Sequence, residues 1–243
     1  MFKSGTTITS FCIVIVFIFL YFGLTTKDQA NYHNNFSTNI DAFAQEENKP
    51  PVVKNSKIIK FSGINYEDIA NSGDINPNSF TVSVWFNTAM NVTGKIDNVF
   101  LLNKGGFGSD RPGFNLNYGL WLNNREKVAG GFETSIGDDY FVTSQGSYAD
   151  GVWHNAILTF DDVSNLLKLY IDGVESATNT PNKGTTPDNT GKQPIRLGAN
   201  SLVEKGLIKG NYTGQLNNIQ VWDYAFTKEQ IGALFNIESK ISR

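Results

Sequence analysis

The sequence is almost without cysteine. Its single cysteine, Cys12, lies inside an apolar run near the N-terminus, so the rest of the 243-residue chain carries no thiol. This excludes disulfides, thiolate metal sites and cysteine catalysis from everything after that run. The cellular compartment must therefore be inferred from the targeting segment.

The chain also lacks an excess of positive charge. It has 20 Lys and Arg residues against 23 Asp and Glu residues, which gives a formal net charge of −3. Proteins that bind nucleic acid usually carry a basic patch that neutralises phosphates. We therefore expect no nucleic acid among the partners.

An uncharged run, Ile8–Leu24, is the most apolar part of the chain. As a helix it would span about 26 Å, just enough for a bilayer core. Residues 1–24 are therefore predicted to be a signal anchor or a signal peptide. Ala42-Phe43-Ala44 has the form of a cleavage site but lies far from the run, so the anchor is favoured. The expected location is the cell membrane, with an extracytoplasmic domain, or secretion if the segment is cleaved.

Residues 25–55 are rich in Asn, Gln, Asp, Glu, Lys and Thr and show no apolar periodicity. This composition predicts a flexible polar stalk, followed by a folded domain over residues 56–243. Three Asn-x-Ser/Thr sequons, at Asn35, Asn91 and Asn211, are candidate glycosylation sites whose occupancy stays open.

Within the predicted domain, short segments of alternating polarity are separated by Gly, Asn, Asp and Pro. This pattern is typical of antiparallel strands with one face on a core. The predicted strands are Ile58–Phe61, Phe80–Phe86, Val99–Asn103, Asn115–Asn123, Val128–Thr134, Tyr140–Ser144, Trp153–Phe160, Leu167–Ile171, Val174–Ser176, Pro194–Leu197 and Gln215–Trp222. Asp172-Gly173 predicts a tight hairpin turn with positive φ angles. The segment Thr227–Gln230 has capping-box form and predicts a short C-terminal helix.

So many short strands without intervening helices indicate two packed antiparallel sheets. The segments in their order resemble the concanavalin A-like lectin/glucanase superfamily, in particular its laminin-G-like and pentraxin-like branch. The residues that carry the resemblance are Ile58–Gly63, Phe80–Phe86, Asp150–His154, Leu167–Gly173, Ile195–Gly198, Tyr212–Ile219 and Val221–Thr227. The resemblance implies an all-β jelly-roll sandwich with one concave and one convex sheet. It also implies binding of glycans or surface proteins, often with Ca²⁺ at the sheet rim.

Some relatives with this fold cleave β-glucans with closely spaced carboxylates on one strand, but no Glu-x-Asp-x-Glu set occurs here. Glu126 and Glu133 are seven residues apart, and Asp138 and Asp139 are adjacent, so they point to opposite faces of a strand. The only histidine of the domain, His154, alternates with Ala156 and is expected to be partly buried. We therefore predict a non-catalytic domain, with a glycoside hydrolase as a weaker alternative.

The candidate ligand-binding residues surround one tryptophan. In Asn115–Asn123, alternation places Asn115, Asn117, Trp121 and Asn123 on the face opposite the apolar one. Aromatic rings beside amides suit sugars, whose C–H faces are apolar and whose hydroxyls need hydrogen-bonding partners. The equally weighted alternative is a tryptophan that fills a face covered by a loop.

Two loops are further candidates for specificity. Gly105–Gly113 contains Arg111, a predicted ligand residue. Ala177–Pro194 is long, without an obvious core residue, and is therefore functional or mobile.

Calcium needs several oxygen ligands. By resemblance to pentraxin-like relatives, the matching positions are Asp110, Asn200 and Glu204, although Ala199–Leu202 lacks the acidic cluster of those relatives. One calcium ion is therefore the most that the sequence supports.

The leading hypothesis is an extracytoplasmic binding module for carbohydrate or glycosylated surfaces, with a protein-binding, adhesive domain of the cell envelope as the alternative.

Overall fold

The computed structural model describes residues 49–69, 75–93, 98–107, 111–202, 207–209 and 211–240. The chain divides into two compact units, Met1–Lys49 and Pro50–Arg243. The run Ile8–Leu24 and the sequon at Asn35 lie outside the described residues. Among the residues described, no helix is both long and apolar enough to cross a membrane.

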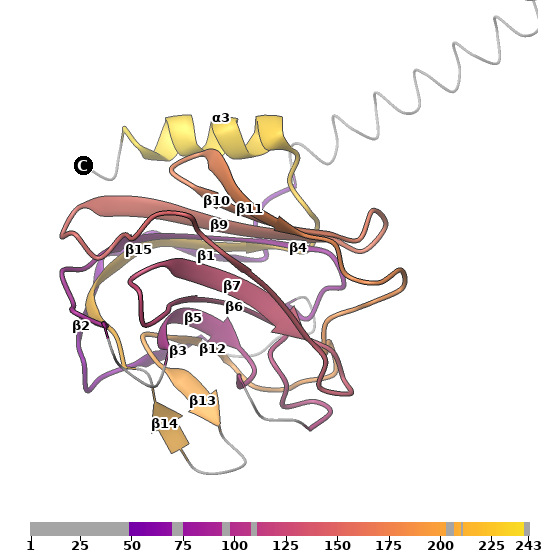
Figure 1. The fold of residues 1–243 in the computed structure, drawn as a ribbon. Helices are drawn as coiled ribbons and strands as arrows, with labels where there is room; N and C mark the ends of the chain where they lie inside the picture. The colour runs from indigo at the N-terminus through magenta and orange to yellow at the C-terminus, as the bar shows by residue number, and fades with distance from the viewer. Residues whose placement is uncertain are drawn as a thin grey trace, which may run out of the picture. The chain divides into compact units, whose positions relative to one another are not determined.

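The second unit is a sandwich of two antiparallel sheets with one helix on its outer side (Figure 1). Sheet A has the order β1 (Val53–Asn55), β15 (Thr213–Trp222), β4 (Phe80–Asn87), β9 (Trp153–Asp161), β10 (Leu166–Ile171) and β11 (Val174–Asn179), and β2 (Ile59–Ser62) also pairs with β15. Sheet B has the order β3 (Glu67–Ile69), β12 (Ile195–Leu197), β5 (Val99–Lys104), β6 (Tyr118–Leu122), β7 (Val128–Glu133) and β8 (Asp139–Thr143). The hairpin of β13 (Asn200–Leu202) and β14 (Leu207–Lys209) projects beyond the sandwich. This confirms the predicted all-β, two-sheet antiparallel class.

The core lies between the two sheets, and the strand alternation explains it. In β4, Val82, Val84 and Phe86 are 0% exposed and belong to the main core cluster. Ala156 and Leu158 of β9 belong to the same cluster, as the alternation predicts.

The domain begins earlier than predicted. Val53 pairs with Val221, and Asn55 pairs with Ile219, so β1 lies inside the predicted stalk (residues 25–55). Three residues are too few to show a periodic apolar pattern, and β15 supplies the pairing that makes this segment a strand.

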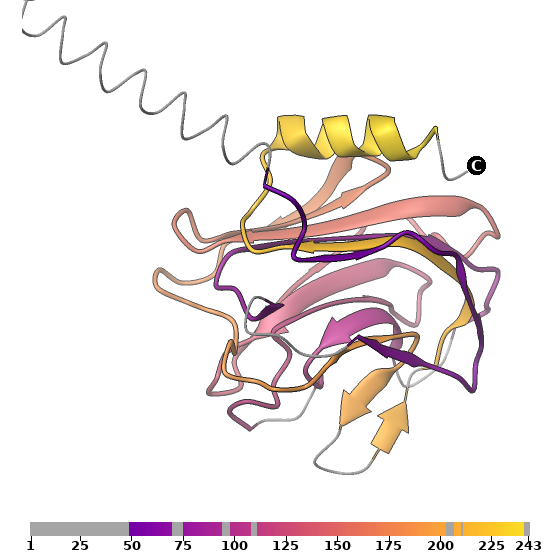
Figure 2. The ribbon, with the colours of Figure 1, turned by 180° about the vertical axis from the view of Figure 1, so that it is seen from behind.

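One helix, α3 (Lys228–Glu238), covers the outer face of sheet A (Figure 2). Thr227 is its N-cap, and the capping box with Gln230 is present, as predicted. Ile231 packs on Ile157 and Tyr170 of the sheet. The strands of sheet A are therefore buried on both sides where the helix lies.

The β10–β11 turn has the predicted form. Asp172 and Gly173 have φ angles of 52° and 77°, the left-handed values of a two-residue hairpin turn. A side chain on Gly173 would also collide with the ring of Phe235, because its Cβ would lie 2.9 Å from the ring.

The long loop Ala177–Pro194 is held by buried polar contacts, although the sequence predicted no core residue there. Asp188 is 1% exposed, and its carboxylate accepts hydrogen bonds from the backbone N–H of Gly113 and the hydroxyl of Thr190, at 2.6 and 2.7 Å. The ammonium of Lys104, on a 1% exposed residue, donates to the backbone carbonyl of Gln193 at 2.6 Å. Buried charges that are hydrogen-bonded in this way fix the loop against the end of sheet B.

The buried ammonium predicts a pH-dependent stability. Burial lowers the pKa of Lys104 to about 8, an effect that Asp188 partly opposes. Between pH 8 and pH 10 Lys104 therefore binds more protons in the unfolded chain than in the folded one, so this group alone should raise the free energy of unfolding with pH, by about 2 kcal/mol. Tyrosines whose pKa burial raises, such as Tyr170, oppose this rise equally in both proteins. In denaturant unfolding at several pH values, the stability of the wild type relative to Lys104→Met should therefore increase from pH 8 to pH 10. Parallel pH dependences in the two proteins would contradict the assignment.

Candidate functional site

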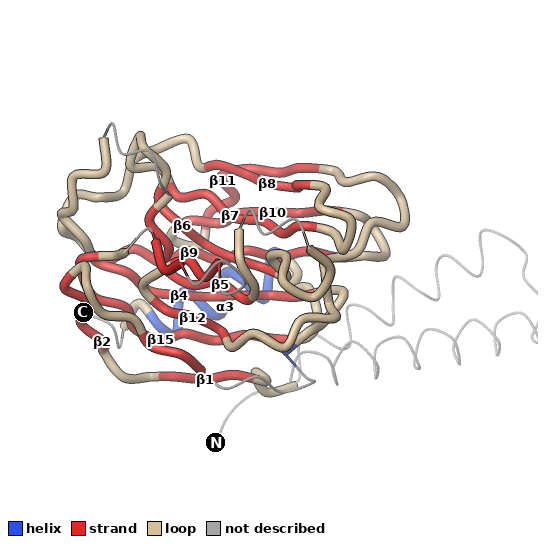
Figure 3. Tube along the Cα trace, turned by 90° about the horizontal axis from the view of Figure 1, so that it is seen from below, coloured by secondary structure: helices blue, strands red, loops and turns tan. Residues whose placement is uncertain are grey.

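Sheet B presents an outer face on the side opposite the core. Strand pairing places Arg196, Asn103, Gly119, Gly131 and Phe141 in one row across five strands, β12, β5, β6, β7 and β8. Figure 3 shows these strands from below. Directly paired residues point to the same side of a sheet, so this row lines one face. The two glycines leave the centre of the row without side chains of its own.

Four aromatic side chains, Phe100, Phe107, Trp121 and Phe141, gather on this face, and we call them the aromatic face. The centroid of Trp121 lies 5.4 Å from Phe100, 5.4 Å from Phe107 and 5.2 Å from Phe141. These spacings are those of packed aromatic pairs. Phe107 comes from the loop after β5, and Phe141 from the edge strand β8.

Within the aromatic face, Trp121 and Phe100 lie beneath Phe107 and Phe141. Trp121 is 3% exposed and Phe100 is 1% exposed, whereas Phe107 and Phe141 are partly exposed. The open tryptophan platform expected from the sequence is therefore absent, and the alternative of a loop-covered tryptophan matches the structure. Strand alternation assigned Trp121 to the correct face, but it could not show that Phe107 would cover it.

The asparagines predicted to flank Trp121 have other partners. β6 begins at Tyr118, so Asn115 and Asn117 precede the strand and its alternation does not apply to them. Asn115 donates to the carbonyl of Thr134 at 2.9 Å and accepts from the N–H of Arg111 at 2.7 Å. Asn117 donates to the carbonyl of Asp188 at 3.0 Å.

Both asparagines before β6 are buried, at 1% and 2% exposure, so neither offers its amide to a ligand beside the tryptophan. Asn123 follows β6, where its carboxamide oxygen accepts the N–H groups of Arg125 and Lys127 and shapes a turn. Arg111 is exposed, and its guanidinium lies 4.8 Å from the ring centroid of Phe114.

Of the three predicted calcium ligands, Asn200 alone lies in the described part of the chain. Asp110 and Glu204 lie outside the described residues. Asn200 accepts the N–H of Phe107 at 3.2 Å and donates to its carbonyl at 3.4 Å, so its carboxamide is engaged by the loop. Among the residues described, no group of three or more His, Cys, Asp or Glu side chains could hold a metal ion.

At the other end of the row, Arg196 contacts Asp68 and Tyr66, a cluster that the sequence did not predict. The guanidinium of Arg196 donates through Nε and Nη2 to the two carboxylate oxygens of Asp68, both at 2.7 Å. It also lies 4.2 Å from the ring centroid of Tyr66. These hydrogen bonds raise the pKa of Arg196, which therefore stays cationic. The hint of this cluster in the sequence was a single charged residue, Arg196, between the apolar residues Ile195 and Leu197.

Polar groups border the exposed rings of the aromatic face. Asn179, at the end of β11, donates through its side chain to the carbonyl of Phe141 at 3.1 Å, which leaves its carboxamide oxygen as an acceptor. Thr143 lies two residues after Phe141 on the same strand and is exposed. The face thus offers two rings, one amide and one hydroxyl.

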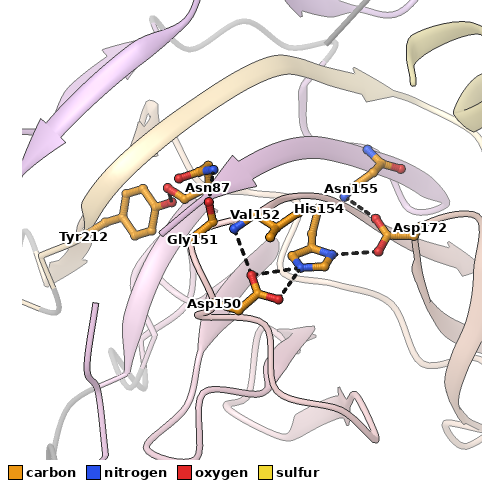
Figure 4. A network of polar contacts seen from close by, with 8 residues as sticks. All are labelled: Asn87, Asp150, Gly151, Val152, His154, Asn155, Asp172 and Tyr212. Carbon is orange, nitrogen blue, oxygen red and sulfur yellow. Dashed lines mark hydrogen bonds and ion pairs between the residues drawn. The ribbon is translucent and has the colours of Figure 1, made fainter. Parts of the chain in front are cut away.

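His154 is held between two carboxylates, as Figure 4 shows. Its Nδ1 lies 2.7 Å from Asp172 Oδ2, and its Nε2 lies 3.2 Å from Asp150 Oδ1. The hydrogen bond with Asp172 is the main cause of its raised pKa. Its ring packs near Phe86 and Tyr148, at centroid distances of 5.9 and 5.0 Å. This is the partly buried, bonded histidine that the sequence predicted.

A laminin G-type family model, described as the concanavalin A-like lectin/glucanases superfamily, matches residues 61–232. No curated protein matches the sequence. Among solved structures, the CBM40 of Ruminococcus gnavus IT-sialidase bound to alpha2,3 sialyllactose aligns with a TM-score of 0.63 and 16% identity, over 76% of this chain and 99% of that one.

Two further solved structures are similar. NanB sialidase from Streptococcus pneumoniae has a TM-score of 0.59 and 15% identity, over 76% of this chain and 28% of that one. The binding domain of Paraclostridial Mosquitocidal Protein 1 has a TM-score of 0.51 and 14% identity, over 76% and 48% of the two chains. At these identities the likeness concerns the fold alone.

The buried position of Trp121 predicts a structural role. Trp121→Ala removes a ring packed among three others and should lower the free energy of unfolding by about 3–5 kcal/mol. Ile136→Ala, at a residue that is 83% exposed in the β7–β8 turn, is the control and should change stability by less than about 0.5 kcal/mol. Chemical denaturation measures both. A loss of less than about 1 kcal/mol for Trp121→Ala would mean that the ring is not packed as described.

Proposed function

The chain belongs to the concanavalin A-like lectin/glucanases superfamily, and on this basis we propose that its second unit is a non-catalytic carbohydrate-binding module. The resemblance stated from the sequence is thereby confirmed at the level of the superfamily. The proposed site is the aromatic face of sheet B. The observation that carries the proposal is the pair of partly exposed rings, Phe107 and Phe141, held in place by the buried Trp121.

Sugar rings suit this arrangement. Their C–H faces pack on aromatic rings, and their hydroxyls need donors and acceptors at the edge of the apolar contact. Asn179 and Thr143 are placed to supply them beside Phe141. Because the rings are fixed by their neighbours, binding costs little side-chain entropy.

Sialylated glycans are the first ligands to test. The R. gnavus CBM40 structure contains sialyllactose, an acidic glycan, and Arg196 is a cation on the same outer face as Phe141. Arginine has five N–H donors, of which Asp68 takes two. Because Arg196 is 7% exposed, it adds positive potential to this face and offers little direct contact to a ligand.

Two carboxylates of this face, Asp68 and Glu133, are engaged in contacts within the fold. Asp68 is paired with Arg196. Glu133 is 2% exposed and accepts the N–H of Leu116 at 2.8 Å. A glycosidase needs two carboxyl groups facing the same bond of its substrate. Asp139, which pairs with Glu133 across β7 and β8, lies on the same face and is exposed, so the glycoside hydrolase stays the weaker alternative.

A protein-binding, adhesive domain is the second candidate. It is favoured by Ile64 and Tyr66, which are 86% and 43% exposed and close together in sequence at one edge of sheet B. In either case the run Ile8–Leu24 supports a place outside the cytoplasm, anchored in the membrane or secreted. We also keep as proposals that the sequons carry glycans and that the domain binds a calcium ion.

A glycan array tests the proposed site. The full chain, kept in solution by a detergent without a sugar head group, should bind sialylated glycans, and Phe107→Ala and Phe141→Ala should each weaken binding by about 3- to 10-fold. Ile136→Ala, which removes an exposed apolar side chain in the β7–β8 turn, should bind like the wild type. Repeating the array with a chelator tests calcium.

Two outcomes would count against the proposal. Binding that both phenylalanine variants retain would place the ligand elsewhere. A folded chain that binds no glycan would favour the protein-binding candidate.

A further inference from the structure

A pocket lies on the helix side of sheet A, the side opposite the aromatic face. It has a volume of about 500 Å³, within the range of small-ligand sites. Its walls come from the end of β4, the start of β9, the β10–β11 turn and the last turns of α3. The principal lining residues are Trp85, Trp153, Asp172, Phe235 and Ser239.

Aromatic rings form the apolar walls of this pocket. Trp85 stacks on Phe235 with centroids 5.7 Å apart and ring planes 8° apart. The indole N–H of Trp85 donates to Glu238 at 2.7 Å, which fixes the ring. Trp153 is partly exposed, and Val152 is 56% exposed at the rim. The walls are therefore preorganised, and one indole is accessible.

The polar groups are also fixed. The carboxylate of Asp172 lies 2.7 Å from Nδ1 of His154 and accepts the N–H of Asn155 at 2.8 Å (Figure 4). Each of its oxygens keeps further lone pairs for a ligand hydroxyl. Within the described residues, the indole N–H of Trp153 makes no hydrogen bond. The pocket thus combines an oriented acceptor with an available donor.

The charges around the pocket disfavour anions. Asp172 and Asp150 contribute carboxylates, and the C-terminal end of α3 carries the negative end of the helix dipole with no basic residue in its last turn. The basic side chains near the pocket are His154, which lies between the two carboxylates, Lys54, which interacts with Glu238, and Lys240, which follows the helix. Since His154 already meets both carboxylates, a cationic ligand would compete with it.

We propose that this pocket is a second glycan site, selective for a neutral pyranose. The inference rests on the proposed carbohydrate-binding function and extends it to the other side of the sandwich. The sugar ring packs its C–H face on Trp153 and Phe235, and its hydroxyls bond Asp172. A domain with sites on opposite faces can hold two sugars of one branched glycan or of two neighbouring glycans.

Ligand-observed NMR on the full chain, in a detergent without a sugar head group, tests the pocket. The probes are methyl glycosides of glucose, galactose, mannose and N-acetylglucosamine. At least one should bind, with its ring protons in contact with the protein, and Trp153→Ala should raise Kd about tenfold or more. Val152→Asp, which puts a charge at the rim, should do the same. The matched control is Val163→Asp, at an 87% exposed valine in the distant β9–β10 turn, and should leave Kd unchanged.

Three results would overturn the inference. The first is a folded wild type that binds none of the four glycosides, and the second is glycoside binding that both pocket variants retain. The third is preferential binding of benzyltrimethylammonium, which would assign the pocket to cations. None of these results would contradict the site on sheet B, which is tested by sialyllactose binding that depends on Phe107 and Phe141. Conversely, a chain that does not bind sialyllactose but binds a neutral glycoside through Trp153 would overturn the site on sheet B and support the pocket on sheet A.

Discussion

The outer face of sheet B must be covered, and much of the domain is organised around that requirement. The central strands β5, β6 and β7 are buried along their whole length, on the core side and on the outer side alike. Sheet A is covered by a helix, whereas in the described part of the chain the outer face of sheet B is covered by loops and by side chains of its edge strand β8. The cover is therefore made of single side chains, above all Phe107 and Phe141, which close over Phe100 and Trp121. Their outward surfaces form the proposed glycan site.

Loops can serve as a cover only if their backbones are held. Asn200 binds both the N–H and the carbonyl of Phe107, and Asp188 binds the backbone of Gly113 on the other side of the same loop. Lys104 donates to the carbonyls of Gly191 and Gln193 and thereby fixes the loop that carries Asp188. Rigid loops of this kind preorganise a binding surface.

Local patterns made most of the fold predictable. The alternation of Phe80–Phe86, the turn at Asp172-Gly173 and the capping box at Thr227 each depend on neighbours within a few residues, and each was predicted correctly. β1 was missed because it is a strand only through its pairing with β15.

The site was less predictable because its contacts are distant in sequence. The covering of Trp121 depends on loop and edge-strand positions that no periodicity specifies. Arg196 meets Asp68 across 128 residues of chain, and nothing local marks Asp188 as buried. Alternation tells which side a residue faces, and the tertiary structure decides whether that side is open.

The most direct test of the account is to map the ligand contact residue by residue. Amide chemical shifts of the isotope-labelled full chain would be recorded during titration with alpha2,3 sialyllactose. The account predicts shifts concentrated around Phe107, Phe141, Thr143 and Asn179, on the outer face of sheet B. Shifts confined to α3 and the start of β9, or no shifts at saturating sugar, would contradict the claim that the aromatic face is a carbohydrate site.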